Sequence, residues 1–472
     1  MGALPHGNRS REKPRERLFF WCFAALSALL VLLPLRTGDL TGYDDAHFAH
    51  MAKDMVVTGD WLNLRSNGAH VLEHPPLFVW MQAILFRAFY QSDAMARLPA
   101  ALCGWGVILL VYALARYLLR DAIAALLAMF VMATTVYFLK YSARAMTDVP
   151  FTFLCLCALA SWLRAEENPG WYLWAGAFTG LAQLTRGLAG AALPVAFLVD
   201  LAVNRRRPPL RHLAAALGLA FVPLLVWYAH TIWVNRATFA VDYGAWLDRE
   251  AFGALSPWWR RYTGVFEYAW MLAKSYWPWV PFMLMGLLTA IRSGDRRLRL
   301  LTVWIAVVFV LCAATKSRVL RYLLPAYPAF SILAAVSLIK LLPPRHIWTS
   351  LRVATGVLAA MMLGIALFPR AEPQAAEIRP LAAAATEATP PGERVAFYDS
   401  GQPRLDEANQ LQWYGDRYLD IMTKPSQLAD KLRDPEPQVF IVDRETYQRD
   451  FALLPHRLVV ETGHLICFRL LP

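Results

Sequence analysis

Acidic and histidine side chains gather in one polar stretch near the N-terminus. Asp44 and Asp45 stand directly before residues 46–57, which have the pattern of a helix. Side chains three residues apart on a helix share a face, so Asp44, His47 and His50 would approach one another. A carboxylate presented in this way could act as a general base toward an acceptor. The simpler alternative is that Asp44 or Asp45 caps the helix N-terminus.

The same stretch offers a second chemistry, the binding of a divalent metal ion. Carboxylate and imidazole groups suit zinc or manganese, and the candidate ligands are Asp44, His47, His50 and Glu73. Their spacing matches no known metal signature. The sequence therefore establishes no cofactor, and a divalent metal ion stays an open alternative.

A second acid and several cations occur farther along the chain. Asp148 opens an apolar stretch in Thr147-Asp148-Val149-Pro150, where it is either a helix cap or a functional acid. Further side chains at the ends of apolar stretches are Arg186, Lys316, Arg318, Arg321 and Tyr322. Cations at a membrane boundary commonly extend toward water, but on the outer side they are disfavoured and need a partner. Anionic lipid head groups or a lipid-linked phosphate would supply one, because Arg binds phosphate through two parallel hydrogen bonds.

Aromatic residues are concentrated between residues 235 and 279, where Trp and Tyr recur. A belt of aromatics at the membrane interface is the default explanation, and stacking on sugar rings is the alternative. Two acids, several cations and many aromatics at one membrane surface would suit a glycosyl donor whose leaving group is a membrane phosphate. The cations would stabilise the charge that develops on the departing phosphate.

The composition sets the elements that must position these residues. Of the 472 residues, 57% are hydrophobic and 17% are charged, whereas soluble domains carry roughly 25% charge. This excludes a soluble enzyme, a disordered chain and a disulfide scaffold, and it predicts that a lipid bilayer surrounds most of the chain. The net charge of +12 is explained by Lys and Arg in the predicted cytoplasmic loops, so no nucleic acid partner is implied.

Apolar stretches of membrane-spanning character predict about eleven transmembrane helices in a mostly α-helical fold. They cover residues 18–35, 98–116, 121–139, 149–163, 171–185, 187–203, 213–234, 275–291, 300–314, 322–341 and 347–368. Residues 77–90 are too short to span, and we expect an interfacial helix there, on the outer side with the first outer loop. The basic loops then all fall inside, with the N-terminus cytoplasmic and the C-terminus outside.

Three regions follow from this pattern: a basic cytoplasmic N-terminus (1–17), a transmembrane domain (18–369) and a small periplasmic α/β domain (370–472). In the last region, apolar runs of strand length alternate with amphipathic stretches. The expected strands are 394–398, 438–442, 458–460 and 465–470, and the expected helical stretches are 404–415, 425–433 and 443–453.

Several short motifs, taken in order, give the chain a family resemblance. They are Gly59-Asp60-Trp61, Glu73-His74-Pro75-Pro76-Leu77, Ala96-Arg97-Leu98-Pro99, Thr147-Asp148-Val149-Pro150, Leu184-Thr185-Arg186-Gly187 and Arg321-Tyr322-Leu323-Leu324-Pro325. With these motifs the chain resembles the type-C integral-membrane glycosyltransferases that use polyprenyl-phosphate sugars. It is similar in particular to the aminoarabinose (lipid A) transferase-like enzymes, which are related to the protein O-mannosyltransferases.

The resemblance implies roles for individual residues. Asp44 matches the acid that binds or deprotonates the acceptor, and Asp148 matches a second outer acid. The donor phosphate would be bound by His74, Arg186, Lys316, Arg318, Arg321 and Tyr322. Asp45, His47 and Glu73 would position the acceptor or the sugar. His74 and Arg186 stand where the lipid A transferases usually have Lys, and His47 where an Arg is frequent, which suggests a different donor or acceptor.

The expected function is inverting transfer of a sugar from an undecaprenyl-phosphate donor to a lipid, glycan or protein at the periplasmic face of a bacterial inner membrane. A transporter or flippase of lipid-linked sugars is the alternative. That alternative predicts polar residues buried in mid-span and a two-fold repeat, whereas here the polar residues cluster at span ends and no repeat is visible. A membrane-anchored binding protein would not need so many spans.

Overall fold

The computed structural model describes residues 14–205, 207–247, 258–315, 318–368, 373–399, 405–433 and 438–471. The chain forms two compact units that do not follow its linear order. The first comprises Met1–Arg36, Leu72–Phe78 and Arg97–Phe368. The second comprises Thr37–Val71, Val79–Ala96 and Pro369–Pro472. The first polar stretch and the C-terminal segment thus share one unit.

The first unit is built from helices, as the composition predicts. Its α-helices are α1 (Pro14–Leu32), α4 (Asp93–Leu119), α5 (Ala122–Ala133), α6 (Val136–Ser142), α7 (Asp148–Arg164), α8 (Trp171–Arg186), α9 (Ala192–Asn204), α10 (Leu210–Val234), α11 (Phe239–Leu247), α12 (Trp258–Ser275), α13 (Val280–Ser293), α14 (Arg296–Ala314), α15 (Tyr327–Leu341) and α16 (Ile347–Leu367). The first four residues of α4 are counted in the second unit. Short 3-10 turns join several of them: η1 (Leu33–Arg36), η2 (Gly187–Ala191), η4 (Leu320–Ala326) and η5 (Pro344–His346).

Seven stretches among the described residues are long and apolar enough to cross a bilayer. The bent pair α5 and α6, with an angle of 66° between them, would add an eighth. The predicted runs 149–163 and 275–291 correspond to α7 and α13, which have 17 and 14 residues. A multi-pass helical fold is confirmed, whereas the count of eleven spans stays a prediction.

The apolar stretch Trp171–Asn204 reverses its direction at Gly187. The indole Nε1 of Trp162, near the end of α7, donates to the carboxylate of Asp200 on α9 at 2.8 Å. The start of α7 instead meets Arg186, at the end of α8. Helix α8 therefore runs antiparallel to both α7 and α9, as two separate predicted spans require. The backbone at Gly187 has φ +56°, a conformation that favours glycine.

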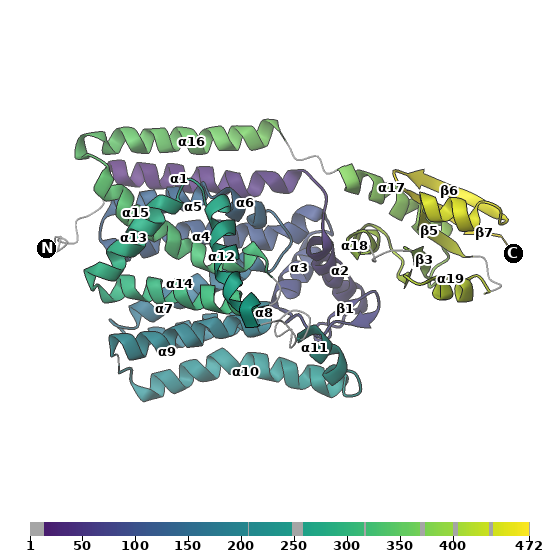
Figure 1. Ribbon diagram of the computed structural model, residues 1–472, viewed down its shortest axis with the longest axis horizontal. Coiled ribbons are helices and arrows are strands. Elements are labelled where there is room, and N and C mark those ends of the chain that lie inside the picture. Colours follow the sequence, from purple (N-terminus) through teal and green to yellow (C-terminus); the bar gives the residue numbers. More distant parts are fainter. Residues whose placement is uncertain are drawn as a thin grey trace. The chain divides into compact units, whose positions relative to one another are not determined.

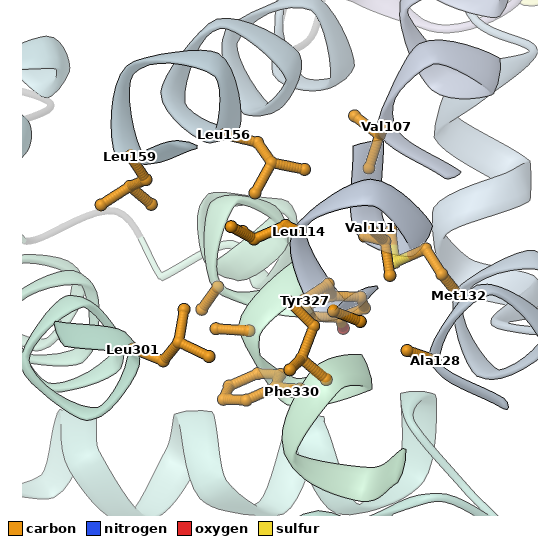
Figure 2. Close-up of a cluster of buried hydrophobic side chains, with 14 of the residues drawn as sticks. Val107, Val111, Leu114, Ala128, Met132, Leu156, Leu159, Leu301, Tyr327 and Phe330 are labelled. Carbon is orange, nitrogen blue, oxygen red and sulfur yellow. The ribbon is translucent and has the colours of Figure 1, made fainter. Parts of the chain in front are cut away.

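The helices pack through a continuous apolar core. Figure 2 shows side chains of α4, α5, α7, α14 and α15 converging, among them Val111, Met132, Leu156, Leu301 and Phe330. Helices α1 and α16 lie side by side (Figure 1). Their N-terminal halves meet where the rings of Phe19 and Trp348 stack at 6.0 Å, so both helices start on the same side.

Close approach of α8 and α10 relies on glycine. Gly176 and Gly180 of α8 face the backbone of α10 at Ala216 and Leu219, where a Cβ atom would collide with a carbonyl oxygen. Small residues let helix backbones meet where lipid, not water, is the competing solvent. This contact fixes α8, the helix that ends at Arg186.

The second unit combines the first polar stretch with a five-stranded sheet. The polar stretch contributes α2 (Tyr43–Thr58), the hairpin strands β1 (Arg65–Ser66) and β2 (Ala69–His70), and most of α3 (Leu77–Ala88). The C-terminal segment contributes α17 (Pro373–Ala388), β3 (Val395–Tyr398), α18 (Leu405–Tyr414), β4 (Leu419–Met422), α19 (Pro425–Lys431), β5 (Val439–Asp443), α20 (Arg444–Thr446), the π-helical turn η6 (Tyr447–Phe451), β6 (His456–Thr462) and β7 (Leu465–Leu470). The position of α3 in this unit supports its prediction as a helix that does not span.

The sheet has the strand order β4-β3-β5-β7-β6. Strand β3 pairs in parallel with β4 and β5, and β7 pairs antiparallel with β5 and β6. Alternate residues of β3 face opposite layers: Val395 and Phe397 pack with α17 and α18, while Ala396 and Tyr398 pack with Leu428 of α19. The small α/β fold is confirmed.

Two features of the C-terminal segment differ from expectation. Strand β4 was not predicted because the charged Asp420 interrupts its short apolar run. The stretch 443–453 forms the short helix α20 followed by η6 instead of one amphipathic helix.

Candidate functional site

Asp148 and Arg186 meet where two antiparallel helices end. Asp148 is the first residue of α7 and is buried, with 2% of its surface exposed. Arg186 is the last residue of α8, and its Nη1 donates to Oδ1 of Asp148. A helix N-terminus favours a negative charge and a C-terminus favours a positive one. The two helix ends thus stabilise the charges that pair there.

A second arginine approaches the same carboxylate from a different element. Arg321 lies on η4, and its Nε is 3.8 Å from Oδ1 of Asp148. The turn η4 is anchored to α14, because Trp304 Nε1 donates to the carbonyl of Pro325 at 2.8 Å. Its position is therefore set by core packing.

The ring of Tyr322 completes this group. The guanidinium carbon of Arg186 lies 4.7 Å from the ring centroid of Tyr322, and that of Arg321 lies 5.8 Å from it. We call Asp148, Arg186, Arg321 and Tyr322 the arginine cluster. One carboxylate and two guanidiniums carry a net positive charge, so the cluster is suited to hold an anion.

The stretch that carries Glu73 and His74 reaches the same helix end. Pro75 and the hydroxyl of Tyr228 lie 3.5 and 3.4 Å from the place that a Cβ atom on Gly187 would occupy. Pro75 and Tyr228 therefore lie within van der Waals reach of the turn at Gly187. Glu73 and His74 are half-buried, and the Glu73 carboxylate accepts a hydrogen bond from the backbone of Leu72 at 3.1 Å.

Not every predicted cation joins the arginine cluster. Arg318 pairs with Glu267 on α12, and its Nη1 also donates to Oγ1 of Thr263 at 3.2 Å. Lys316 lies outside the described residues, and so do the side chains of Trp258 and Trp259 in the aromatic-rich stretch.

Asp44 belongs to the second unit, where it lies on helix α2. Helix α2 begins at Tyr43, three residues earlier than expected, so Asp44 and Asp45 lie in its first turn. The N-cap residue is Gly42, so neither Asp44 nor Asp45 occupies the N-cap position. Asp44 is half-buried, whereas Asp45 is 2% exposed. Of the two, Asp44 is the better placed to meet a substrate.

The histidines of α2 pack against the β1–β2 hairpin. The ring nitrogen Nδ1 of His47 lies 3.4 Å from Oγ of Ser66, and Nε2 of His50 accepts from the backbone N–H of Asn67 at 3.3 Å. Both histidines are buried. Across the described part of the chain, no three His, Cys, Asp or Glu side chains are grouped so that they could hold a metal ion.

Two buried groups on α2 have shifted pKa values. Burial lowers the pKa of His50 from 6.5 to about 3, and the nearby charges of Lys53 and His47 act in the same direction. Burial raises the pKa of Asp54 from 3.8 to about 6, although a hydrogen bond from Tyr418 opposes this. His50 Nε2 and Asp54 Oδ2 are 3.6 Å apart. Near neutral pH the pair is a neutral imidazole beside a carboxylate.

These shifts predict opposing effects of pH on stability. The lowered pKa of His50 contributes stability above about pH 6.5 that is lost on acidification, about 2 kcal/mol by pH 5. The raised pKa of Asp54 contributes stability below about pH 4, and this contribution is lost as pH rises through 6. At pH 5 it compensates for about 1 kcal/mol of the stability lost through His50, after allowance for solvent screening. The Asp54→Asn variant has no carboxyl group to protonate, so it lacks this compensating stability at pH 5. Its Tm should therefore fall further than that of the wild type between pH 7.5 and pH 5; equal falls would contradict the assignment.

Sequence reasoning missed the residues that hold α2 in place. They include Lys53, whose Nζ contacts the carbonyl oxygens of Trp413 and Gly415, and Asn67, which bonds to Leu419. Their partners are more than 350 residues away in sequence. A lysine on a helical face shared with Ala49 and Val56 was the available signal for Lys53.

The chain matches known proteins in sequence. Residues 73–233 match the profile of the family described as dolichyl-phosphate-mannose-protein mannosyltransferase. An uncharacterised protein of Aquifex aeolicus is 27% identical over 69% of this chain and 66% of its own length. The undecaprenyl phosphate-alpha-4-amino-4-deoxy-L-arabinose arabinosyl transferase 1 of Proteus mirabilis is 25% identical over 68% of this chain and 59% of its own length. The matched region thus spans less than two-thirds of these relatives.

Solved structures extend the likeness to the whole fold. ArnT from Cupriavidus metallidurans, bound to undecaprenyl phosphate, aligns with a TM-score of 0.78 at 19% identity, covering 95% of this chain and 97% of that one. The oligosaccharyltransferase AglB from Archaeoglobus fulgidus aligns with a TM-score of 0.59 at 15% identity, covering 92% and 70%. The fold is that of the type-C integral-membrane glycosyltransferases. In sequence, the chain is similar to the arabinosyl transferases and, over residues 73–233, to the protein mannosyltransferases.

Proposed function

We propose that the chain transfers a sugar from a polyprenyl-phosphate donor, undecaprenyl phosphate in bacteria, to an acceptor at the periplasmic face of the inner membrane. The observation that carries this proposal is the arginine cluster, in which two guanidiniums converge on one buried carboxylate at the end of a membrane helix. Ionisable residues in such a place are costly and are retained for function. The arabinosyl transferases of the family are named for an undecaprenyl phosphate-linked donor.

The geometry of the arginine cluster supports a role in binding the donor, and the sequence resemblance supports Asp44 as the acceptor base. Arg186 and Arg321 would bind the donor phosphate and stabilise its charge as the glycosidic bond breaks. Asp148 would hold both arginines in place, and the ring of Tyr322 would pack against both guanidinium groups. Asp44 would take the proton of the acceptor, which attacks the sugar carbon from the face opposite the phosphate and inverts that centre.

His74, Lys316 and Arg318 stay candidate phosphate ligands from the sequence. Asp45, His47 and Glu73 stay candidates for positioning the acceptor or the sugar. The burial of Asp45 and His47 favours a supporting role behind Asp44 over direct contact with substrate.

The test of the function is a transfer assay with purified protein in lipid nanodiscs. A radiolabelled undecaprenyl-phosphate sugar is mixed with envelope lipids and glycans, and the label is followed into product. Transfer that depends on the protein, with release of undecaprenyl phosphate, is the expected result. Movement of intact donor between leaflets of sealed vesicles, without transfer, would favour a flippase instead.

We further propose that the N-terminus is cytoplasmic and that the second unit is periplasmic. Packing in one unit supports placing the first polar stretch and the C-terminal segment on the same side, and the basic loops of the first unit support the cytoplasmic N-terminus. A reporter active only in the periplasm should be active when fused after Leu471 and silent when fused after Arg205. The reverse pattern would overturn the orientation.

A further inference from the structure

Leu40, four residues before Asp44, is held through both of its backbone groups. Its N–H donates to the hydroxyl of Tyr414 at 2.9 Å, and its carbonyl accepts from Nε2 of Gln410 at 2.9 Å. Leu40 and Gln410 are fully buried. Gln410 and Tyr414 are four residues apart on α18, so they share one face of that helix.

The hydroxyl of Tyr414 is oriented by a third residue. It donates to Oδ2 of Asp93 at 3.1 Å, which leaves an oxygen lone pair to accept the N–H of Leu40. The indole of Trp413 donates to the other oxygen of Asp93 at 2.7 Å. The hydrogen bond from Leu40 to Tyr414 therefore belongs to a connected hydrogen-bond network that includes Asp93 and Trp413.

The other end of α2 is held by the same part of the C-terminal segment. Lys53 Nζ contacts the carbonyl of Gly415 at 2.5 Å, directly after α18, and Oδ1 of Asp416 at 2.8 Å. The side chain of Asn67 exchanges two hydrogen bonds of 2.8 Å with the backbone of Leu419 on the edge strand β4. Both flanks of α2 thus depend on residues 410–419.

Asp44 lies in the first turn of α2. Its helix starts after Gly42, with no side-chain cap, so the first turn relies on the chain that leads into it. That chain is Leu40 and its two partners. A shift of the first turn would move Asp44 away from its acceptor, and a displacement of about 1 Å can reduce a rate by about a hundredfold.

We propose that Gln410 and Tyr414 are positioning residues for Asp44, so that the C-terminal segment is a working part of the transferase site. The inference rests on the proposed function, in which Asp44 is the base. It predicts that Gln410→Ala and Tyr414→Phe lower kcat roughly tenfold and leave the KM for the donor unchanged, because donor binding is assigned to other residues. The matched control is Gln427→Ala, whose side-chain oxygen accepts from the backbone N–H groups of Thr423 and Lys424, just before α19.

The experiment combines kinetics with hydrogen exchange on the full-length protein in nanodiscs. Exchange of the backbone N–H groups of residues 38–50 should be faster in Gln410→Ala and Tyr414→Phe and unchanged in Gln427→Ala. In an Asp44→Asn background, Gln410→Ala should cause no further loss of kcat, because the base that it positions is already gone. An equal tenfold loss in that background, or full kcat in both single variants, would overturn the positioning role.

Activity and hydrogen exchange together distinguish a failure of the positioning role from a failure of the proposed function. Full activity of Asp44→Asn would overturn the assignment of the base and, with it, the positioning role. Unchanged exchange at residues 38–50 in both variants would show that Gln410 and Tyr414 do not hold Leu40 in place. The proposed function would be unaffected by that result.

Discussion

Asp148→Asn is expected to abolish sugar transfer, with a loss of at least about a hundredfold in kcat/KM. The carboxylate is almost fully buried and faces Arg186 and Arg321 at once. An amide cannot neutralise either guanidinium, so two like charges would be left close together in a poorly hydrated place. Breaking a buried pair in this way costs about 3–5 kcal/mol. The arginines would separate, and the phosphate site between them would be lost.

The measurement is the transfer rate of purified variants, with insertion checked by the yield of monodisperse protein from membranes. Asp121→Asn is the matched control, because Asp121 also stands at the start of an apolar helix but only caps it, accepting from Ile123 and Ala124. Asn caps a helix nearly as well, so this variant should keep its activity. Full transfer by Asp148→Asn would remove the arginine cluster from the mechanism.

A second large effect is expected from Asp44→Asn, which should lower kcat by about 10²–10⁴-fold without weakening donor binding. The amide retains the size of the side chain and its place in the first turn of α2, but it cannot accept a proton. The loss should therefore appear in kcat, while the KM for the donor stays near the wild-type value. Steady-state kinetics with varied donor at saturating acceptor separates the two constants.

Asp60→Asn provides the comparison from the same polar stretch. The carboxylate of Asp60 accepts from the backbone of Leu62 and Asn63 and from the side chains of Asn63 and Arg65, and an Asn side chain can still accept from the backbone. Activity within about twofold of wild type is expected, since surface changes of this kind seldom exceed 0.5 kcal/mol. A loss of donor binding in Asp44→Asn, with kcat preserved, would assign Asp44 to the donor instead of the acceptor.

Much of the transmembrane architecture was predictable, because a bilayer imposes length and hydropathy on each helix. The helix ends at Asp148 and Arg186 were predicted from a change of composition alone, and both charges stand at the termini that favour them. That they pair with each other was not predictable, since it depends on α8 running back along α7. The contribution of Arg321 likewise depends on the core contact that anchors η4.

The second unit was less predictable, for a reason of sequence distance. The amphipathic patterns of the C-terminal segment gave the α/β fold, but no local pattern reports that Leu40 is bound by Gln410 and Tyr414. Such backbone hydrogen bonds leave no periodic signal in either partner. The burial of Asp45 and His47, which looked as available as Asp44, was equally hidden, because it is created by packing between distant segments.

An anion site formed by Arg186 and Arg321 is central to the proposed mechanism, and a structure of the protein with undecaprenyl phosphate would show whether that site binds the donor phosphate. Cryo-electron microscopy in nanodiscs with this lipid should show the phosphate hydrogen-bonded to both guanidiniums, at about 2.7–2.9 Å from their nitrogens. Asp148 should remain paired behind them. A phosphate bound elsewhere, with Arg186 and Arg321 contacting only Asp148, would contradict the account.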